Sequence, residues 1–238
     1  DAYRLAVRNP QQLLQSYRVT ISFTVIGTVL AVLIMGMMAY PLSRPNYKFR
    51  KLVTFVVFFT MLFGGGLVPS YLVNVRYLHL DNKLWIYILP SLVSAWNIII
   101  IRTNYAQLPK ELIESAKIDG ANELYICFRI IMPLSKPVLA TIGFFFFVNK
   151  WNDWMTAVIY INKPNLYSLQ YLLQRILREA EFLKQMAEEN QVVEQGAVYP
   201  TESFRFAMAL LAAGPVLVIF PFFQKYFSKG MTIGAVKG

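Results

Sequence analysis

The chain has 238 residues and a net charge of +10, with 56% hydrophobic and only 15% charged residues. Because the apolar residues come in long runs, this composition argues against a soluble globular domain and predicts one membrane domain. A single cysteine, Cys127, excludes an internal disulfide, and a single histidine, His79, argues against a His-based metal site or catalytic triad. The sequence has no GxxxxGK[ST] stretch, so we expect no ATP binding through such a loop.

Five apolar stretches predict an all-α, polytopic membrane protein with a single transmembrane domain over residues 1–238. The first, Val19 to Tyr40, carries no charged residue, and at about 1.5 Å per residue it covers a bilayer core of about 30 Å. The second contains Gly64 to Gly66, which we expect to loosen its far end. The predicted spans are 19–40, 52–74, 84–101, 137–161 and 206–227.

A polar stretch between the third and fourth spans, residues 108–133, predicts two short helices outside the membrane. Pro109 suits the first turn of the first helix, which runs to about Ile118. Gly120 can take the left-handed conformation that ends a helix, and Asn122 is a suitable N-cap for the second. Helical spacing predicts one apolar stripe on the second helix, formed by Leu124, Cys127, Phe128 and Ile131.

The distribution of basic residues predicts the orientation in the membrane. The segments 41–51, 102–136 and 225–238 are rich in Lys and Arg, and we place them in the cytoplasm, together with the tail 228–238. The segment 162–204 carries more acidic than basic residues and is placed outside, with a predicted amphipathic helix around Leu169 to Ile176. Residues 1–18 then also fall outside, so we expect one more transmembrane helix before Asp1, six in all. Finding Asp1 encoded directly after the start codon would contradict this expectation.

The polar stretch resembles the E-A-A…D-G-A…I-x-L-P motif of ABC-importer permease subunits. Two positions depart from the motif. Ser115 replaces the alanine at the second position of the motif, and Met132 replaces its leucine. The resemblance implies that this region couples the permease to an ATPase. The candidate coupling residues are Glu114, Ser115, Ala116, Asp119, Gly120, Ala121, Ile130 and Pro133.

Nearly the whole chain resembles maltose-type carbohydrate permeases, and especially the branch of polysaccharide and lipoprotein-region transporters. The supporting stretches are Ala39–Arg44, Gly65–Pro69 with Tyr71–Leu72, Trp151–Trp154 and Gly234–Gly238. The resemblance implies a type I ABC importer fold in the bacterial inner membrane, with cytoplasmic coupling helices in region 108–133.

The same resemblance implies partners and a substrate. Two ATPase subunits would bind ATP and Mg, a second and different permease would complete the pathway, and an external solute-binding protein would deliver a carbohydrate, with no nucleic acid involved. The carbohydrate would be an oligosaccharide moved by alternating access, and an acidic alginate- or pectin-derived fragment is one candidate. This chain itself would have no catalytic residue. The tail residues Gly234, Val236, Lys237 and Gly238 would reach the ATPase dimer, or else form a frayed terminus.

A polar group of residues in the fourth span suggests a substrate pathway. Lys150 lies about 20 Å along the span from Pro137, where charged groups face protein or water. Lys150 can pair with Asp153 three residues on, while Trp151 and Asn152 have side chains suited to sugars. Asn97 in the third span lines the pathway or bonds two helices, and Trp154 suits an interfacial aromatic belt. The pathway candidates are Asn97, Lys150, Trp151, Asn152 and Asp153.

Three other functions compete with this interpretation. A permease for a non-sugar solute shares the coupling motif, and a channel or scaffold would work without ATP. Co-purification of an ATPase separates the channel or scaffold from an importer. A membrane-embedded enzyme is disfavoured, because the spans offer only Lys150 and Asp153 as ionisable groups.

Overall fold

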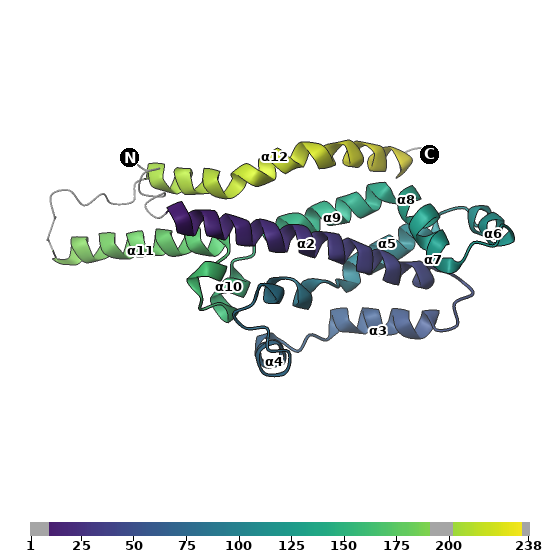
Figure 1. The fold of residues 1–238 in the computed structure, drawn as a ribbon, viewed down its shortest axis with the longest axis horizontal. Helices are drawn as coiled ribbons and strands as arrows, with labels where there is room; N and C mark the ends of the chain where they lie inside the picture. Colours follow the sequence, from purple (N-terminus) through teal and green to yellow (C-terminus); the bar gives the residue numbers. More distant parts are fainter. Residues whose placement is uncertain (1–9, 191–201, 235–238) are drawn as a thin grey trace.

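The computed structural model describes residues 10–190 and 202–234, and this part of the chain is helical throughout, without strands (Figure 1). The α-helices are α2 (Pro10–Ser43), α3 (Arg50–Leu62), α4 (Leu67–Leu72), α5 (Ala95–Ala106), α6 (Glu111–Ile118), α7 (Glu123–Tyr125), α8 (Met132–Leu134), α9 (Lys136–Trp151), α10 (Met155–Tyr160), α11 (Leu169–Asn190) and α12 (Glu202–Gly234). Two segments are π-helical, η1 (Val73–Tyr77) and η4 (Ile126–Ile131), and three are 3₁₀-helical, η2 (Leu84–Tyr87), η3 (Leu89–Ser91) and η5 (Pro164–Leu166).

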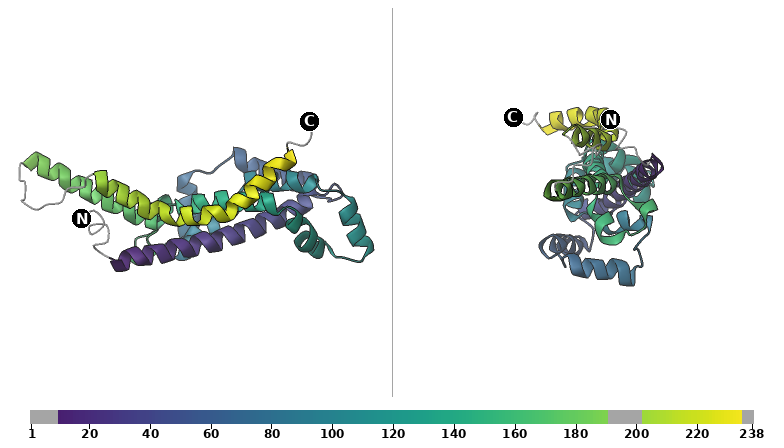
Figure 2. Two further views of the ribbon diagram at one scale, coloured as in Figure 1. Left: turned by 90° about the horizontal axis from the view of Figure 1, so that it is seen from above. Right: turned by 90° about the vertical axis from the view of Figure 1, so that its left-hand side faces the viewer.

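Helix α2 is the axis on which the other helices pack. Its 34 residues reach about 51 Å, and its buried face contacts α5 and α9, while α12 lies along α9 (Figures 1 and 2). Gly36 allows close approach where α2 passes Met132 and Tyr105. A Cβ there would lie 3.0 Å from the Met132 methyl carbon and 3.2 Å from the Tyr105 hydroxyl. A larger residue at 36 would therefore require the ends of the Met132 and Tyr105 side chains to move.

Among the described helices, α2 alone is long and apolar enough to cross a membrane unaided. Three bent helix pairs meet the same length and composition only when each pair is taken together: α3 with α4–η1 at 113°, η2–η3 with α5 at 52°, and α7–α8 with α9 at 80°. The expected loosening at Gly64 to Gly66 is a full break, in which Gly66 takes a φ of +81°. The predicted range 84–101 is also broken, because 3₁₀ turns precede Ser94, whose side chain caps α5 at Asn97 N. The range 137–161 divides at Asn152 into α9 and α10.

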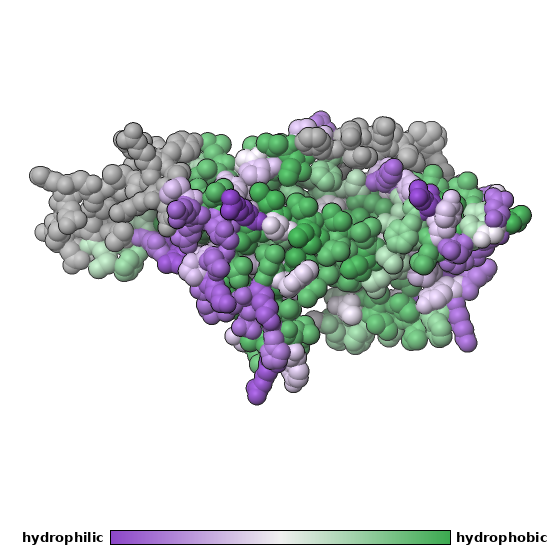
Figure 3. Space-filling view, viewed as in Figure 1, coloured by the Kyte–Doolittle hydropathy of each residue, from purple (hydrophilic) through white to green (hydrophobic). Residues whose placement is uncertain are grey.

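The described surface has an apolar middle with hydrophilic residues toward the two ends (Figure 3). This is the surface expected of a protein whose middle lies in a bilayer. The predicted amphipathic helix is present as α11, whose buried face contains Leu169, Leu172 and Leu173 and packs beside α2 and α12 (Figure 2).

Candidate functional site

The predicted coupling region forms one end of the molecule, where α6 and α7 are joined by a tight turn (Figure 1). The amide of Gly120 donates to the carbonyl of Lys117 at 3.0 Å, and the amide of Ala121 donates to the carbonyl of Ala116 at 2.9 Å. With Gly120 at φ +78°, these two bonds form a Schellman helix end. The Asn122 side chain then accepts from the amide of Tyr125 at 2.8 Å and caps the next helix. The expected turn and cap are confirmed.

The second helix of this region differs from the sequence prediction. Leu124 and Phe128 of the predicted apolar stripe are exposed, whereas Cys127, Ile131 and the unpredicted Ile126 are buried. Residues 126–131 are π-helical, and this wider winding shifts which side chains share a face. The π-helix comes just before Pro133, which lacks an N–H to continue a regular α-helical ladder.

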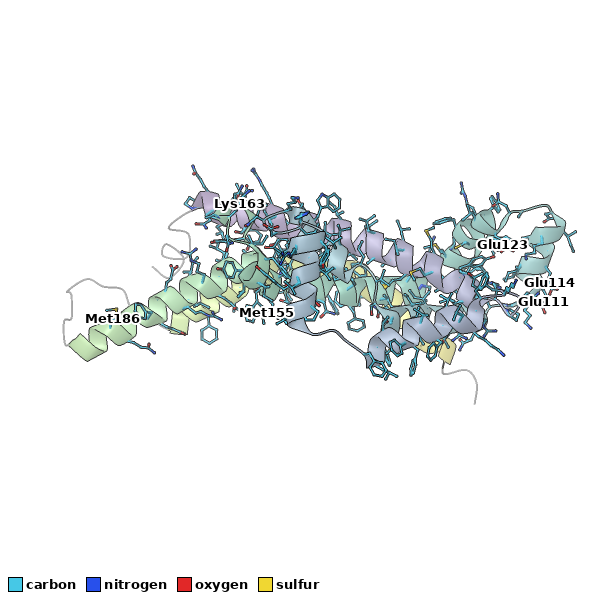
Figure 4. All side chains as sticks on the ribbon, turned by 90° about the horizontal axis from the view of Figure 1, so that it is seen from below. Glu111, Glu114, Glu123, Met155, Lys163 and Met186 are labelled. Atoms are coloured by element: carbon cyan, nitrogen blue, oxygen red, sulfur yellow. The ribbon has the colours of Figure 1, made fainter. Side chains whose placement is uncertain are left out.

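The two faces of α6 have opposite characters. Ile113 and Ala116 are buried in the core formed with α2, α5 and η4, while Glu114, Ser115, Asp119 and Gly120 are exposed. Ile118 is 86% exposed, and Leu112 of the same helix is also exposed. Figure 4 shows Glu111 and Glu114 together near the tip of this end, with Glu123 close behind. The exposed surface of α6 therefore combines carboxylates with two apolar side chains, of which Ile118 is the more exposed.

A polar brace that sequence reasoning missed connects α6 and α7 to α2. The Lys117 ammonium lies 2.6 Å from Glu123 Oε1, and the Tyr40 hydroxyl donates to Glu123 Oε2 at 2.5 Å. The Arg44 guanidinium lies 4.8 Å from the centre of the Tyr40 ring. Tyr40 and Glu123 are 83 residues apart in sequence. The brace lines a groove of about 640 Å³ that also contains Glu114.

The brace makes the stability of this end depend on pH. Hydrogen bonds from Lys117 and Tyr40 hold the pKa of Glu123 below its ordinary value. A carboxylate with a lowered folded-state pKa stabilises the fold above its unfolded pKa, about 4.3, and loses that contribution as pH falls through the folded value. We expect Glu123→Gln to lower the melting temperature of the purified chain at pH 7, and the difference from the wild type to shrink as pH falls through the lowered folded-state pKa of Glu123. Glu111→Gln, on the exposed side of α6, is the control and should leave the melting temperature unchanged. If the melting-temperature difference between Glu123→Gln and the wild type did not depend on pH, the brace would be contradicted.

The predicted pathway residues of the fourth span lie in different surroundings. Trp151 is 1% exposed and donates from its indole nitrogen to the carbonyl of Ala212 at 2.8 Å. Lys150 is 8% exposed, donates to the carbonyl of Tyr87 at 2.6 Å and lies 3.7 Å from Asp153 Oδ2. Both side chains thus bond to other helices of the described structure, and a role of Lys150, Trp151 and Asp153 in the pathway stays a prediction. Asn152 is exposed and accepts from Gln170 at 3.2 Å.

We expect Asp153→Asn to destabilise the fold. The substitution removes the carboxylate that lies 3.7 Å from the buried Lys150 ammonium and leaves the carbonyl of Tyr87 as its hydrogen-bond partner, and breaking a buried ion pair costs on the order of 3 kcal/mol. The melting temperature of the purified chain should fall by several degrees. Glu179→Gln, which breaks an exposed pair with Arg175 at 2.7 Å, should change it little. Equal effects of the two substitutions would refute a structural role for the buried pair.

A polar stripe on α5 gives a better-exposed candidate for solute contact. Trp96 is 62% exposed, and Thr103, Asn104 and Gln107 follow on the same side of the helix. Together with apolar neighbours they line a groove of about 340 Å³. Asn97, the residue predicted from sequence, is only half-buried beside this stripe. Trp96, Thr103 and Gln107 lie seven and four residues apart, which is the spacing of one helical face, and this spacing could be read from the sequence.

Residues 19–233 match the protein family described as binding-protein-dependent transport system inner membrane component. The chain belongs to this family. It is therefore a multi-pass component of an inner membrane, and the family's name states that transport depends on a binding protein.

Relatives of this permease are similar over its full length. It is 43% identical to Protein LplC of Bacillus subtilis (strain 168), across 100% of the chain and 79% of that protein. It is 40% identical to the polygalacturonan/rhamnogalacturonan transport system permease protein YtcP of the same organism, across 100% of the chain and 82% of that protein. A crystal structure of a bacterial ABC transporter involved in import of the acidic polysaccharide alginate has a chain with the same fold, with a TM-score of 0.80 and 28% identity over 95% of the permease and 78% of that chain.

Proposed function

We propose that the chain is the permease subunit of an ATP-driven importer, paired with a second permease, two ATPase subunits that bind ATP and Mg, and an external solute-binding protein. The observation that carries this proposal is the outer face of α6, an exposed surface of a transport-family permease with carboxylates and a projecting isoleucine. Such a surface fits a partner cleft that offers both a cationic group and an apolar pocket.

Coupling would proceed through α6 and the brace. Glu114 makes a charge-assisted hydrogen bond to the ATPase, and Ile118 inserts into its cleft. When the ATPase dimer closes, α6 moves, and the Lys117–Glu123–Tyr40 contacts carry that movement to α2. Because α2 packs on α5 and α9, the spans then change their packing and the pathway alternates between the two sides. The proposed tail contact through Val236, Lys237 and Gly238 lies outside the described residues.

We expect Glu114→Gln to weaken the association with the ATPase subunit by about tenfold, because it replaces a charge-assisted bond by a neutral one. Glu111→Gln removes the same charge from the same helix one turn earlier and serves as the matched control. The measurement is the amount of ATPase subunit that co-purifies at increasing salt. Equal losses in both variants would mean that only net charge matters and that Glu114 makes no specific contact.

The proposed cargo is an oligosaccharide, and an acidic one in particular. The relatives' names include transport of arabinooligosaccharides and of polygalacturonan/rhamnogalacturonan, and the structural relative takes part in alginate import. Within this chain, the α5 stripe has the side chains that such a cargo needs. The indole of Trp96 can stack on a sugar ring. The hydroxyl of Thr103 and the amides of Asn104 and Gln107 can form hydrogen bonds with the sugar hydroxyls. Asn97 and Asn152 remain proposed pathway residues.

Uptake by the reconstituted transporter tests the function. The permease, its partner permease, the ATPase and the binding protein are placed in liposomes, and oligogalacturonate, neutral arabino-oligosaccharide and an amino acid are supplied. We expect ATP-dependent uptake of the acidic sugar, reduced by Trp96→Ala and unaffected by Trp85→Ala, a similarly exposed tryptophan away from the stripe. Uptake without ATP would favour a channel, and uptake of the amino acid alone would overturn the sugar assignment.

A further inference from the structure

A third groove opens where the chain passes from α2 to α3, on the side of α5 away from the stripe. Its volume is about 750 Å³. It is lined by the connecting segment, the first two turns of α3 and one residue of α5: Pro45, Asn46, Tyr47, Lys48, Arg50, Lys51, Thr54, Phe55, Phe58 and Arg102. Pro45, Asn46 and Tyr47 also line the brace groove, whereas the lining residues of α3 and α5 do not.

The charge of this groove has one sign. Lys48, Arg50, Lys51 and Arg102 contribute four cations, and no acidic side chain is in the lining. None of the four has an acidic partner among the salt bridges of the described residues. Arg102 is fixed in place because its Nε donates to the carbonyl of Leu42 at 3.0 Å. The groove is thus a concentrated and partly preorganised positive site.

The same groove leads onto an apolar surface. Phe55 is 62% exposed and Phe58 is also exposed, and both belong to the lining. Along the rest of α3, Leu52, Phe59 and Leu62 are exposed as well. The helix therefore presents a cationic end joined to an apolar face. The Thr54 hydroxyl, also in the lining, is buried without a hydrogen-bond partner in the described structure.

We propose that this groove binds an anionic phospholipid, with the phosphate group among the four cations and the acyl chains along the face of α3. A free phosphate would use the cations but leave the aromatic face uncovered. A zwitterionic lipid would bring its own cation into a site that already holds four. The combination of basic head site and apolar track matches an anionic lipid of the cytoplasmic leaflet.

The test uses the transporter purified from its native membrane with its partner subunits and exchanged into nanodiscs of phosphatidylcholine with phosphatidylglycerol. Native mass spectrometry then measures the lipid retained on the permease. We expect wild type to retain phosphatidylglycerol over phosphatidylcholine, and Lys48→Gln with Lys51→Gln to lower that retention by about tenfold. Both lysines are exposed, so the variant should fold normally. Arg129→Gln with Lys136→Gln removes two exposed charges outside the groove and should retain the lipid.

Four outcomes would overturn the proposal. Equal retention of the two lipids, or equal effects of the two double variants, would show that no specific head site exists. Displacement of the lipid by millimolar inorganic phosphate would identify a free-anion site. A photo-crosslinker in place of Tyr47, which also lines the groove, should capture lipid; capture of the second permease would show that a protein covers the groove.

Discussion

Replacing Ile118 by aspartate is expected to abolish assembly with the ATPase and to stop transport. The side chain is 86% exposed, so the permease itself has little to lose from the change. In the proposed complex the isoleucine is buried in the ATPase cleft, where it contributes about 1.5–3 kcal/mol. Aspartate removes that contribution and adds the desolvation of a carboxylate. The combined loss exceeds about 100-fold in association.

Co-purification of the ATPase subunit and uptake into liposomes measure this effect. Ile118→Leu, which keeps the apolar volume, should retain most of both. The melting temperature of the isolated chain should be the same in all three proteins, because Ile118 lies outside the packed core. An Ile118→Asp transporter that assembles and transports normally would mean that the tip of α6 does not enter the ATPase.

Gly120→Val is expected to uncouple the transporter by a different route. Gly120 has a φ of +78°, a conformation that costs an ordinary residue about 1–2 kcal/mol and is least accessible to a β-branched one. There is free space around the position, since a Cβ there would meet nothing within 4 Å. The cost is therefore conformational, and the chain relieves it by giving up the Schellman bonds that fix α7 relative to α6.

Losing that turn should also separate Lys117 from Glu123, and ATP hydrolysis should continue with at least a tenfold loss of uptake. Gly64→Val is the matched control, because Gly64 also has open space but no positive φ. Gly120→Asn should retain more function than valine, since asparagine tolerates the left-handed region. Equal activity of Gly120→Val and Gly64→Val would contradict a role for this turn.

Local backbone requirements were predictable from sequence, and long-range contacts were not. Gly120 and Asn122 were identified because a helix end and a helix cap each need a particular residue type. The buried face of the next helix was mispredicted, because regular α-helical spacing was applied to residues that are π-helical. The one local signal for the π-helix is Pro133, which follows its C-terminal end.

The brace and the Lys150–Asp153 pair also show that local features can be predicted from sequence and long-range contacts cannot. Tyr40 and Glu123 meet only because α2 and α7 are packed together, and no spacing rule connects residues so far apart in sequence. For Lys150, sequence predicted both the depth and the pairing with Asp153. It did not reveal the direction of the side chain, which the carbonyl of Tyr87 determines. The α5 stripe has helical spacing in the sequence, but its residues are uncharged. The pathway prediction instead rested on the charged residues Lys150 and Asp153 of the fourth span.

The most direct test of the coupling account is a photo-crosslinker, p-benzoylphenylalanine, placed at position 118 of the permease in its native membrane. The account predicts an ATP-sensitive cross-link to the ATPase subunit, absent when the crosslinker replaces Phe182 of α11 at the opposite end of the molecule. A cross-link from position 118 only to lipid or to the second permease would contradict it, because α6 would then lie outside the ATPase contact.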